Sequence, residues 1–310
     1  MSKAVYYIFY TLSLLPFRVL YALSDIMYVM VYVVVRYRRN IVRHNLSTAF
    51  PEKTTAEIKQ TERRFYHWFC DYFFESIKLL SLSERELRKR LVITNSDVLE
   101  QCFRQGRDTA ALLGHYCNWE WLSRVGYDMA EDRRQCLIYD PLHNRIFDEL
   151  FFRIRSYPPN GIPVPKQRVL RQLVRWKREG IRSLSGYIAD QAPEWRNIHF
   201  WLPFLHHNTP VYTGAERIIR QMNDVVFFVE MTRPKRGYYH VTYRLLSDHP
   251  ADLPEFELTR RFFSTLEDCI RRNPVPYLWT HNRWKRTHEE YDRLFETVNG
   301  RVVPRTATHQ

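Results

Sequence analysis

The feature that most constrains the fold is a short apolar run that ends in a histidine. Residues 109–113 read Thr-Ala-Ala-Leu-Leu; Gly114 and His115 follow them, and Glu120 comes five positions after the histidine. A run of this kind predicts a buried strand, with a helix starting near residue 119. The pattern therefore places an imidazole at the end of a strand with a carboxylate near it. A histidine oriented by a carboxylate is typical of a general base that takes a proton from a hydroxyl or from water.

Strands and helices alternate along most of the chain. We expect helices at residues 54–80, 119–129, 143–155, 167–178, 214–222 and 257–272. We expect strands at residues 91–93, 109–113, 135–139, 183–189, 211–213, 225–231, 238–246 and 277–279, and a loop at 157–165, where four prolines exclude a helix or a central strand. This alternation predicts an α/β fold with a mostly parallel central sheet flanked by helices. Chemistry in such sheets gathers at the carboxyl ends of the strands, where His115 and Asp190 are both expected.

The composition favours anionic partners and a reducing compartment. Lys and Arg total 47 against 34 Asp and Glu, which gives a formal net charge of +13. Such a surface suits nucleic acid, a phosphorylated lipid, an acidic carrier protein or an anionic membrane face. The five cysteines are scattered and form no Cys-x-x-Cys pair, so we expect the main body of the protein to face the cytoplasm.

The N-terminal segment, residues 4–35, is overwhelmingly apolar and aromatic, although no uninterrupted apolar run reaches about 18 residues. Only Lys3 precedes it, whereas four arginines follow it: Arg36, Arg38, Arg39 and Arg43. The positive-inside rule therefore places the later part of the chain on the cytoplasmic side. We expect a membrane-attached segment, either spanning the bilayer or lying in its interface. A signal peptide and a buried helix hairpin are the alternatives.

Four ordered segments resemble one family. Gly114–Glu120 is similar to the His-x4-Asp/Glu motif of the lysophospholipid acyltransferase superfamily. It is closer to the Gly-His-x-x-Asn-Trp-Glu form of the lipid A late acyltransferases, the lauroyl and myristoyl transferases of lipopolysaccharide assembly. Residues 39–52 resemble that family's Arg-rich, Asn-Leu…Phe-Pro signature, residues 189–191 its Asp-Gln strand end, and residues 277–285 its closing Trp-x-His-x-Arg-Phe/Trp-Lys motif. The similarity runs in order over roughly residues 4–287.

The resemblance implies a glycerol-3-phosphate acyltransferase-like fold and a transfer of an acyl group from acyl carrier protein to a glycolipid hydroxyl. His115 is then the general base and Glu120 its orienting partner, with no acyl-enzyme intermediate. Backbone N–H groups just after His115 are expected to stabilise the oxyanion. The resemblance also implies a bacterial inner membrane location with the catalytic domain on the cytoplasmic face, and no cofactor or metal.

Four further residues are expected to bind substrate: Arg168, Asp190, Gln191 and Arg283. Arg168 matches a family arginine by position and suits phosphate or carrier recognition, because a guanidinium binds phosphate bidentately. The alternative is a solvated face, since Arg168 lies in a strongly basic helix. The alternative for Asp190 is a structural role, in which it caps the end of its strand and binds no substrate. Arg283 either binds phosphate or extends toward a membrane surface.

Cys117, a group of three histidines and Leu205 raise further possibilities for the site. Cys117 lies close to His115, but side chains two apart on an extended loop point away from each other, which argues against a nucleophile. His199, His206 and His207 lack the ligand spacing of a metal site. Leu205 stands where many relatives have glycine, so we expect it to reshape the acyl or acceptor pocket.

We therefore expect a membrane-anchoring segment at residues 1–38, an acyltransferase domain at 39–290 and a peripheral tail at 291–310. The leading hypothesis is an acyltransferase that acts on a lipid A precursor. The alternatives are an acyltransferase acting on a lysophospholipid or an amino-acid lipid, and a non-catalytic protein that binds a membrane surface. A nucleic-acid binder is the least favoured, because the chain contains no known motif of that class.

Overall fold

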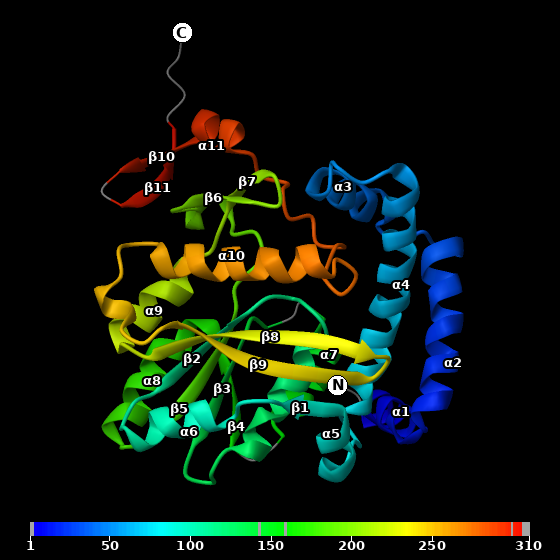
Figure 1. The fold of residues 1–310 in the computed structure, drawn as a ribbon, viewed down its shortest axis with the longest axis horizontal. Coiled ribbons are helices and arrows are strands. Elements are labelled where there is room, and N and C mark those ends of the chain that lie inside the picture. Colours follow the sequence, from blue (N-terminus) through cyan, green and yellow to red (C-terminus); the bar gives the residue numbers. More distant parts are fainter. Residues whose placement is uncertain (1–2, 142–143, 158–159, 299, 306–310) are drawn as a thin grey trace.

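The centre of the protein is a seven-stranded sheet, seen in a computed structural model that describes residues 3–141, 144–157, 160–298 and 300–305 (Figure 1). The strand order is β1-β9-β8-β2-β5-β3-β4. Every neighbouring pair is parallel except β8–β9. The strands are β1 (Leu91–Ile93), β2 (Thr109–Leu113), β3 (Arg134–Tyr139), β4 (Gly161–Pro165), β5 (Ser183–Ile188), β8 (Val225–Lys235) and β9 (Tyr238–Ser247). The predicted α/β class with a mostly parallel sheet is confirmed.

Helices flank this sheet. They are α5 (Glu84–Arg90), α6 (Asp97–Arg104), η2 (Trp119–Asp128), α7 (Arg145–Arg155), η3 (Lys166–Arg168), α8 (Val169–Arg178), α9 (Gly214–Met222), η5 (Pro250–Asp252) and α10 (Glu257–Arg272). The long helix α10 packs along β2, β8 and β9 (Figure 1). Two hairpins lie outside the main sheet, β6 (Trp201–Phe204) with β7 (His207–Pro210) and β10 (Phe295–Val298) with β11 (Arg301–Pro304). The remaining helices of this part are η4 (Trp195–Asn197) and α11 (His288–Leu294).

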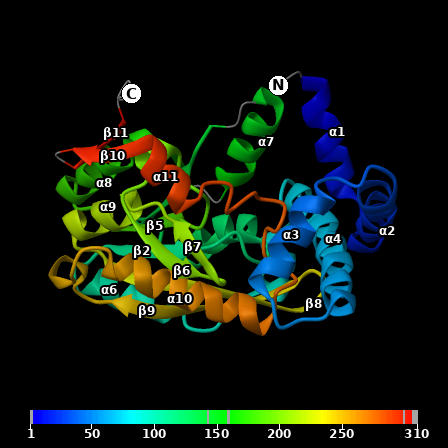
Figure 2. The ribbon, with the colours of Figure 1, turned by 90° about the horizontal axis from the view of Figure 1, so that it is seen from above.

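The N-terminal helices form a unit beside the sheet. They are α1 (Lys3–Leu14), α2 (Phe17–Tyr28), the π-helical turn η1 (Val29–Val34), α3 (Arg39–Ala49) and α4 (Thr55–Lys78). Both α1 and α2 pack against α4, and α2 lies on its outer side (Figures 1 and 2). The start of α4 is fixed by a capping box, in which the Thr54 hydroxyl accepts the Glu57 N–H and the Glu57 carboxylate accepts the Thr54 N–H.

The stretch Phe17–Val34 is long and apolar enough to cross a bilayer, judged by its length and composition. Only 17% of it is buried within the protein. Large apolar side chains are exposed along it: Val19, Ile26, Val29, Met30, Val33 and Val34. A wholly buried helix hairpin therefore does not describe this segment, and its exposed face weakly suggests association with a membrane.

The helix expected at residues 119–129 is present as a 3-10 helix over Trp119–Asp128. Three other sequence predictions of local structure differ from the fold. The proline-rich loop ends in β4, which is tolerated because an edge strand pairs on one side only and its prolines need not donate to a second neighbour. Residues 211–213 follow a hairpin strand instead of forming one. Residues 277–279 lie outside the sheet, and Tyr277 forms an isolated antiparallel bridge with Tyr116. These elements depend on long-range neighbours that local patterns do not show.

Candidate active site

His115 and Asp190 meet at the carboxyl edge of the sheet. His115 follows β2 and Asp190 follows β5, and these two strands are parallel neighbours with Leu113 opposite Ile188. The imidazole Nδ1 lies 2.6 Å from Asp190 Oδ1, and the same oxygen accepts the His115 backbone N–H at 3.1 Å. The sequence prediction that both residues lie at this edge is correct, because the ends of adjacent parallel strands are held together by the strand register.

The Asp190 carboxylate fixes which imidazole nitrogen is free. Burial raises the pKa of Asp190, but the charge and hydrogen bonds of His115 and the charge of Arg283 outweigh this effect and hold the pKa below its usual value. An ionised carboxylate can only accept, so in the neutral imidazole Nδ1 carries the proton and Nε2 keeps its lone pair. Gln191 Nε2 donates to that Nε2 at 3.2 Å. A nitrogen with an available lone pair and an anion behind the ring is the arrangement of a general base.

Glu120 does not orient His115, contrary to the sequence prediction. Its carboxylate forms an ion pair with Arg155 of α7, at 2.6 Å from Nη2 and 3.0 Å from Nε, and it accepts the Trp119 Nε1–H at 3.2 Å. The Trp119 ring lies edge-on to the imidazole, with 4.8 Å between ring centroids. A buried carboxylate requires a counter-charge, and Arg155 supplies it more strongly than a neutral imidazole does. Asp190, and not Glu120, is therefore the carboxylate that contacts the His115 ring in this structure.

Arg155 is the residue of this site that sequence reasoning missed. It lies at the end of α7, near other arginines that the local pattern does not separate from it. The signal that could have found it is the burial of Glu120, whose side chain is only 3% exposed and which must be paired. The Arg155 guanidinium also lies over the Phe151 ring.

An apolar cavity lies beside Glu120 and Arg155, both of which line it together with Trp119. Part of its wall is a row of cross-strand neighbours on three parallel strands: Ala111 of β2, Gly186 of β5 and Leu137 of β3. The cavity exists at this place because two of these three side chains are small. Trp119 touches the His115 ring, so the cavity adjoins the candidate base.

Arg283 supports Asp190 from within the protein. It is 2% exposed, its Nη1 donates to the Pro210 carbonyl oxygen at 2.9 Å, and its charge helps to lower the pKa of Asp190. Extension toward a membrane surface is therefore excluded by its burial, while a direct contact with substrate stays a prediction.

Arg168 is exposed in the short turn η3, ahead of α8. None of the contacts around His115 described above involves it, and the arginines that the fold brings to this site are Arg155 and Arg283. A role for Arg168 in phosphate or carrier recognition stays a prediction.

Cys117 is fully buried, and its thiol donates to the Met231 carbonyl oxygen at 3.3 Å. Burial raises its pKa far above the usual value, which is the opposite of what a nucleophilic thiolate needs. Within the described residues, no group of three or more His, Cys, Asp or Glu side chains is placed to hold a metal ion.

Leu205 has a backbone φ of 50°, in the left-handed region that favours glycine. It is fully buried, and its N–H donates to Glu267 Oε2 at 2.9 Å. Glycine would adopt this backbone conformation without the strain that a side chain brings. Leu205 does not line the cavity beside His115. The structure therefore gives no support to the expectation that Leu205 reshapes this pocket.

The pH dependence of stability is expected to depend on His281, whose Nε2 accepts the Ala192 N–H at 3.2 Å. Burial, helped by the charge of Arg283, lowers the pKa of His281 to about 4. The unfolded chain therefore binds a proton below about pH 6.5 that the folded chain does not, and the free energy of unfolding falls as the pH drops from about 6.5 to 4. The total loss is roughly 3 kcal/mol. His281→Gln should flatten this slope in urea unfolding between pH 7 and 4.5, and an unchanged slope would contradict the assignment.

Comparison with known families adds an independent observation. The family model of bacterial lipid A biosynthesis acyltransferases matches residues 3–286. The chain belongs to this family. The family indicates lipid A acyltransferase activity, and its match includes the loop of His115 and the strand end of Asp190. No curated protein matches the sequence.

Proposed function

We propose that this protein transfers a fatty acyl chain from acyl carrier protein to a hydroxyl of a lipid A precursor. The observation that carries this proposal is the His115–Asp190 pair, held at 2.6 Å beside an apolar cavity. The pair supplies a base for a hydroxyl, and the cavity suits a hydrocarbon chain. An acceptor of a different kind, a lysophospholipid or an amino-acid lipid, would use the same base and cavity.

In the proposed reaction, His115 Nε2 takes the proton of the acceptor hydroxyl as its oxygen attacks the thioester carbonyl carbon. The carbon–sulfur bond then breaks, and the imidazolium returns the proton to the leaving thiolate, which gives an ester and a free thiol. The Asp190 carboxylate stabilises the transient imidazolium. Replacement of the Gln191 amide by the acceptor hydroxyl would place the proton to be removed against Nε2.

Arg155 is the cationic residue that lines the cavity, and it would stabilise negative charge on the thioester oxygen. The backbone amides of Tyr116 and Cys117 are already engaged, since they donate to Gly114 O and Pro276 O at 2.7 Å each. The backbone donors expected just after His115 are therefore not these two. Glu120 holds the Arg155 guanidinium in place through two hydrogen bonds.

The cavity wall gives a prediction about acyl-chain length. A Cβ added at Gly186 meets only the Cys136 carbonyl oxygen, at 3.8 Å, so a larger residue fits the backbone and fills the cavity instead. We expect Gly186→Leu to lower kcat/KM for the longest accepted acyl chain about tenfold or more, and to shift preference toward shorter chains. The check is a competition assay with a ladder of acyl donors. Gly214→Leu is the control, because a Cβ there meets nothing within 4 Å and Gly214 does not line the cavity. Equal chain preference in the Gly186 variant and the wild type would refute this placement.

Attachment to the bacterial inner membrane, with the site on the cytoplasmic face, is supported by the N-terminal unit. The exposed apolar side of Phe17–Val34 is followed at once by the arginines of residues 36–43. Arg36, Arg38, Arg39 and Arg43 line one surface hollow next to α3. Such a hollow suits lipid phosphates, and the net charge of +13 suits an acidic carrier.

Lipid A mass spectrometry of a deletion strain tests this function. We expect the strain to lose one acyl chain from its lipid A, and wild-type protein, but not His115→Ala, to restore it. An unchanged lipid A profile in the deletion strain would refute the acceptor. Loss of an acyl chain from another lipid class in the same extracts would favour a lysophospholipid or an amino-acid lipid.

A further inference from the structure

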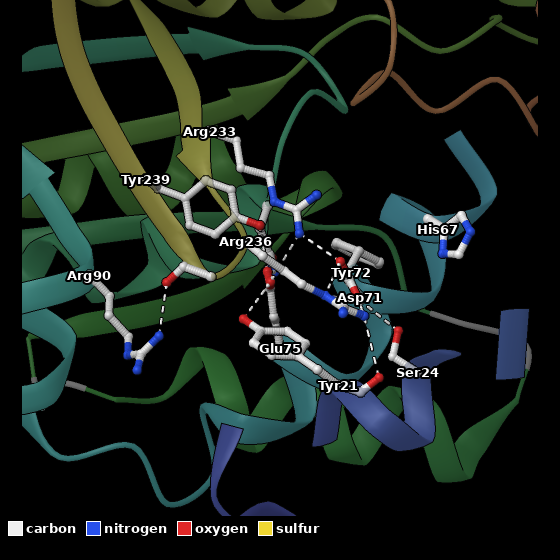
Figure 3. Close-up of polar contacts among 12 residues, drawn as sticks. Tyr21, Ser24, His67, Asp71, Tyr72, Glu75, Arg90, Arg233, Arg236 and Tyr239 are labelled. Atoms are coloured by element: carbon white, nitrogen blue, oxygen red, sulfur yellow. Dashed lines mark hydrogen bonds and ion pairs between the residues drawn. The ribbon is translucent and has the colours of Figure 1, made fainter. Parts of the chain in front are cut away.

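Glu75 is a buried carboxylate on α4 that receives donors from three separate parts of the chain. Its side chain is 0% exposed. The Tyr21 hydroxyl of α2 donates to Oε1 at 3.1 Å, Asn118 Nδ2 donates to Oε2 at 3.1 Å, and the Tyr239 hydroxyl of β9 also donates to Oε2. Figure 3 shows Tyr21 and Tyr239 converging on Glu75. A buried carboxylate with this many donors fixes the elements that supply them.

Asp71, one turn earlier on α4, extends the same network. It accepts the Arg233 guanidinium of β8 at 2.6 Å and the Ser24 hydroxyl of α2 at 2.7 Å. Arg236 donates to Asp71 at 2.6 Å (Figure 3). The same guanidinium donates to Asp25 of α2 at 2.7 Å. The network therefore ties the apolar helix α2, the helix α4 and the β8–β9 hairpin together. Every link in it joins residues at least 43 apart in the sequence.

The network reaches the candidate active site through Glu75. Asn118 lies in the loop between His115 and η2, and it is fully buried. Trp121 Nε1 donates to the Glu75 backbone oxygen at 3.2 Å. Glu75 thus holds the residues on both sides of Trp119 and Glu120. Both of these residues contact the candidate site: Trp119 packs against the His115 ring, and Glu120 pairs with Arg155.

We propose that Glu75 is a positioning residue that ties the loop 118–121 to the helix α2. The position of α2 relative to α4 then controls the geometry around His115. This inference rests on the proposed function, because it assigns a role in that reaction. Glu75 itself touches neither His115 nor the cavity in the described structure; it acts through Asn118 and Trp121. Displacement of the loop by a fraction of an ångström would misplace Trp119 and Glu120 with respect to the reacting groups.

Steady-state kinetics of the full-length protein in phospholipid vesicles test the proposal, with acyl-acyl carrier protein and a lipid A precursor. We expect Glu75→Gln to lower kcat about tenfold to a hundredfold while KM for the acyl donor changes less than about twofold. Tyr21→Phe removes the direct bond between α2 and Glu75 and leaves the Ser24 and Asp25 bonds of α2 in place, and we expect it to lower kcat about threefold to tenfold. Either variant with the kcat of the wild type would overturn the proposal.

The control for a purely structural effect is Glu216→Gln. Glu216 is also buried, and it accepts the Thr259 backbone N–H at 2.8 Å together with the Thr259 hydroxyl, in a pairing that does not reach the loop 118–121. We expect this control to lose thermal stability as Glu75→Gln does and to keep kcat within about twofold. A fall in kcat equal to that of Glu75→Gln would overturn the positioning role.

Asn118→Ala keeps the proposal testable if Glu75→Gln does not fold, because it cuts the bond between the Glu75 carboxylate and the loop and leaves the bonds among α2, α4 and the hairpin intact. It is expected to lower kcat in the same way, and an unchanged kcat would overturn the proposal. Different results would contradict the proposed function and the role of Glu75. A wild type with no transfer activity contradicts the proposed function, whereas an active wild type with equally active variants contradicts only the role of Glu75.

Discussion

Replacement of His115 by alanine is expected to lower kcat for acyl transfer between about a hundredfold and ten-thousandfold. The variant keeps the cavity and the Glu120–Arg155 pair but has no group that can take the hydroxyl proton. KM for the acyl donor should change little, because the chain is bound by the cavity wall. The measurement is single-turnover transfer to a lipid A precursor with saturating acyl-acyl carrier protein.

The matched control is His240→Ala, which removes an exposed histidine from β9. It should retain the kcat of the wild type. A His115 variant that transfers acyl chains as fast as the wild type would show that the imidazole is not the base, whatever its geometry.

Replacement of Asp190 by asparagine is expected to lower kcat about a hundredfold or more while leaving the fold intact. The amide is similar in shape to the carboxylate, but it carries no charge to stabilise the imidazolium and can present its NH2 group to Nδ1, which reverses the tautomer. Glu120→Gln should act differently, because Glu120 pairs with Arg155 rather than with His115. Equal activity of Asp190→Asn and the wild type would contradict the assignment of Asp190 as the orienting carboxylate.

The stability of the Asp190 variant gives a second readout. The pKa of Asp190 in the folded protein lies below its ordinary value of 3.8, so the ionised form stabilises the fold at neutral pH. This stabilisation is present above about pH 4 and is lost as the pH falls through the folded-state pKa. Asp190→Asn should therefore have a lower free energy of unfolding than the wild type at pH 7, and the difference should shrink as the pH falls below about 4.

The positions of His115 and Asp190 could be predicted from the sequence because a simple rule governs them. Both follow strands of a parallel sheet, and adjacent parallel strands end at the same edge. The carboxylate that orients His115 could not be predicted in the same way. Glu120 is nearer to His115 in sequence, but it is buried and α7 packs close to it. Arg155, one of several arginines on that helix, therefore forms its ion pair.

The hydrogen-bond network of Glu75 could not be predicted from the sequence, for the same physical reason. An amphipathic aromatic helix at residues 54–80 is clear from its spacing, and α4 confirms it. The spacing does not show that Glu75 of this helix accepts from Tyr21, Asn118 and Tyr239, because these residues lie 54, 43 and 164 positions away. Polar networks in a core depend on how the elements pack, whereas periodicity shows only that a face is buried.

The most direct test uses purified protein, acyl-acyl carrier protein with an isotope-labelled chain, and a lipid A precursor with a free hydroxyl, followed by mass spectrometry of the lipid product. The account predicts a product heavier by one labelled acyl residue, joined through an ester that mild base cleaves, and formed by the wild type but not by His115→Ala. A product formed equally by both proteins, or no labelled lipid from the wild type with this donor and acceptor, would contradict it.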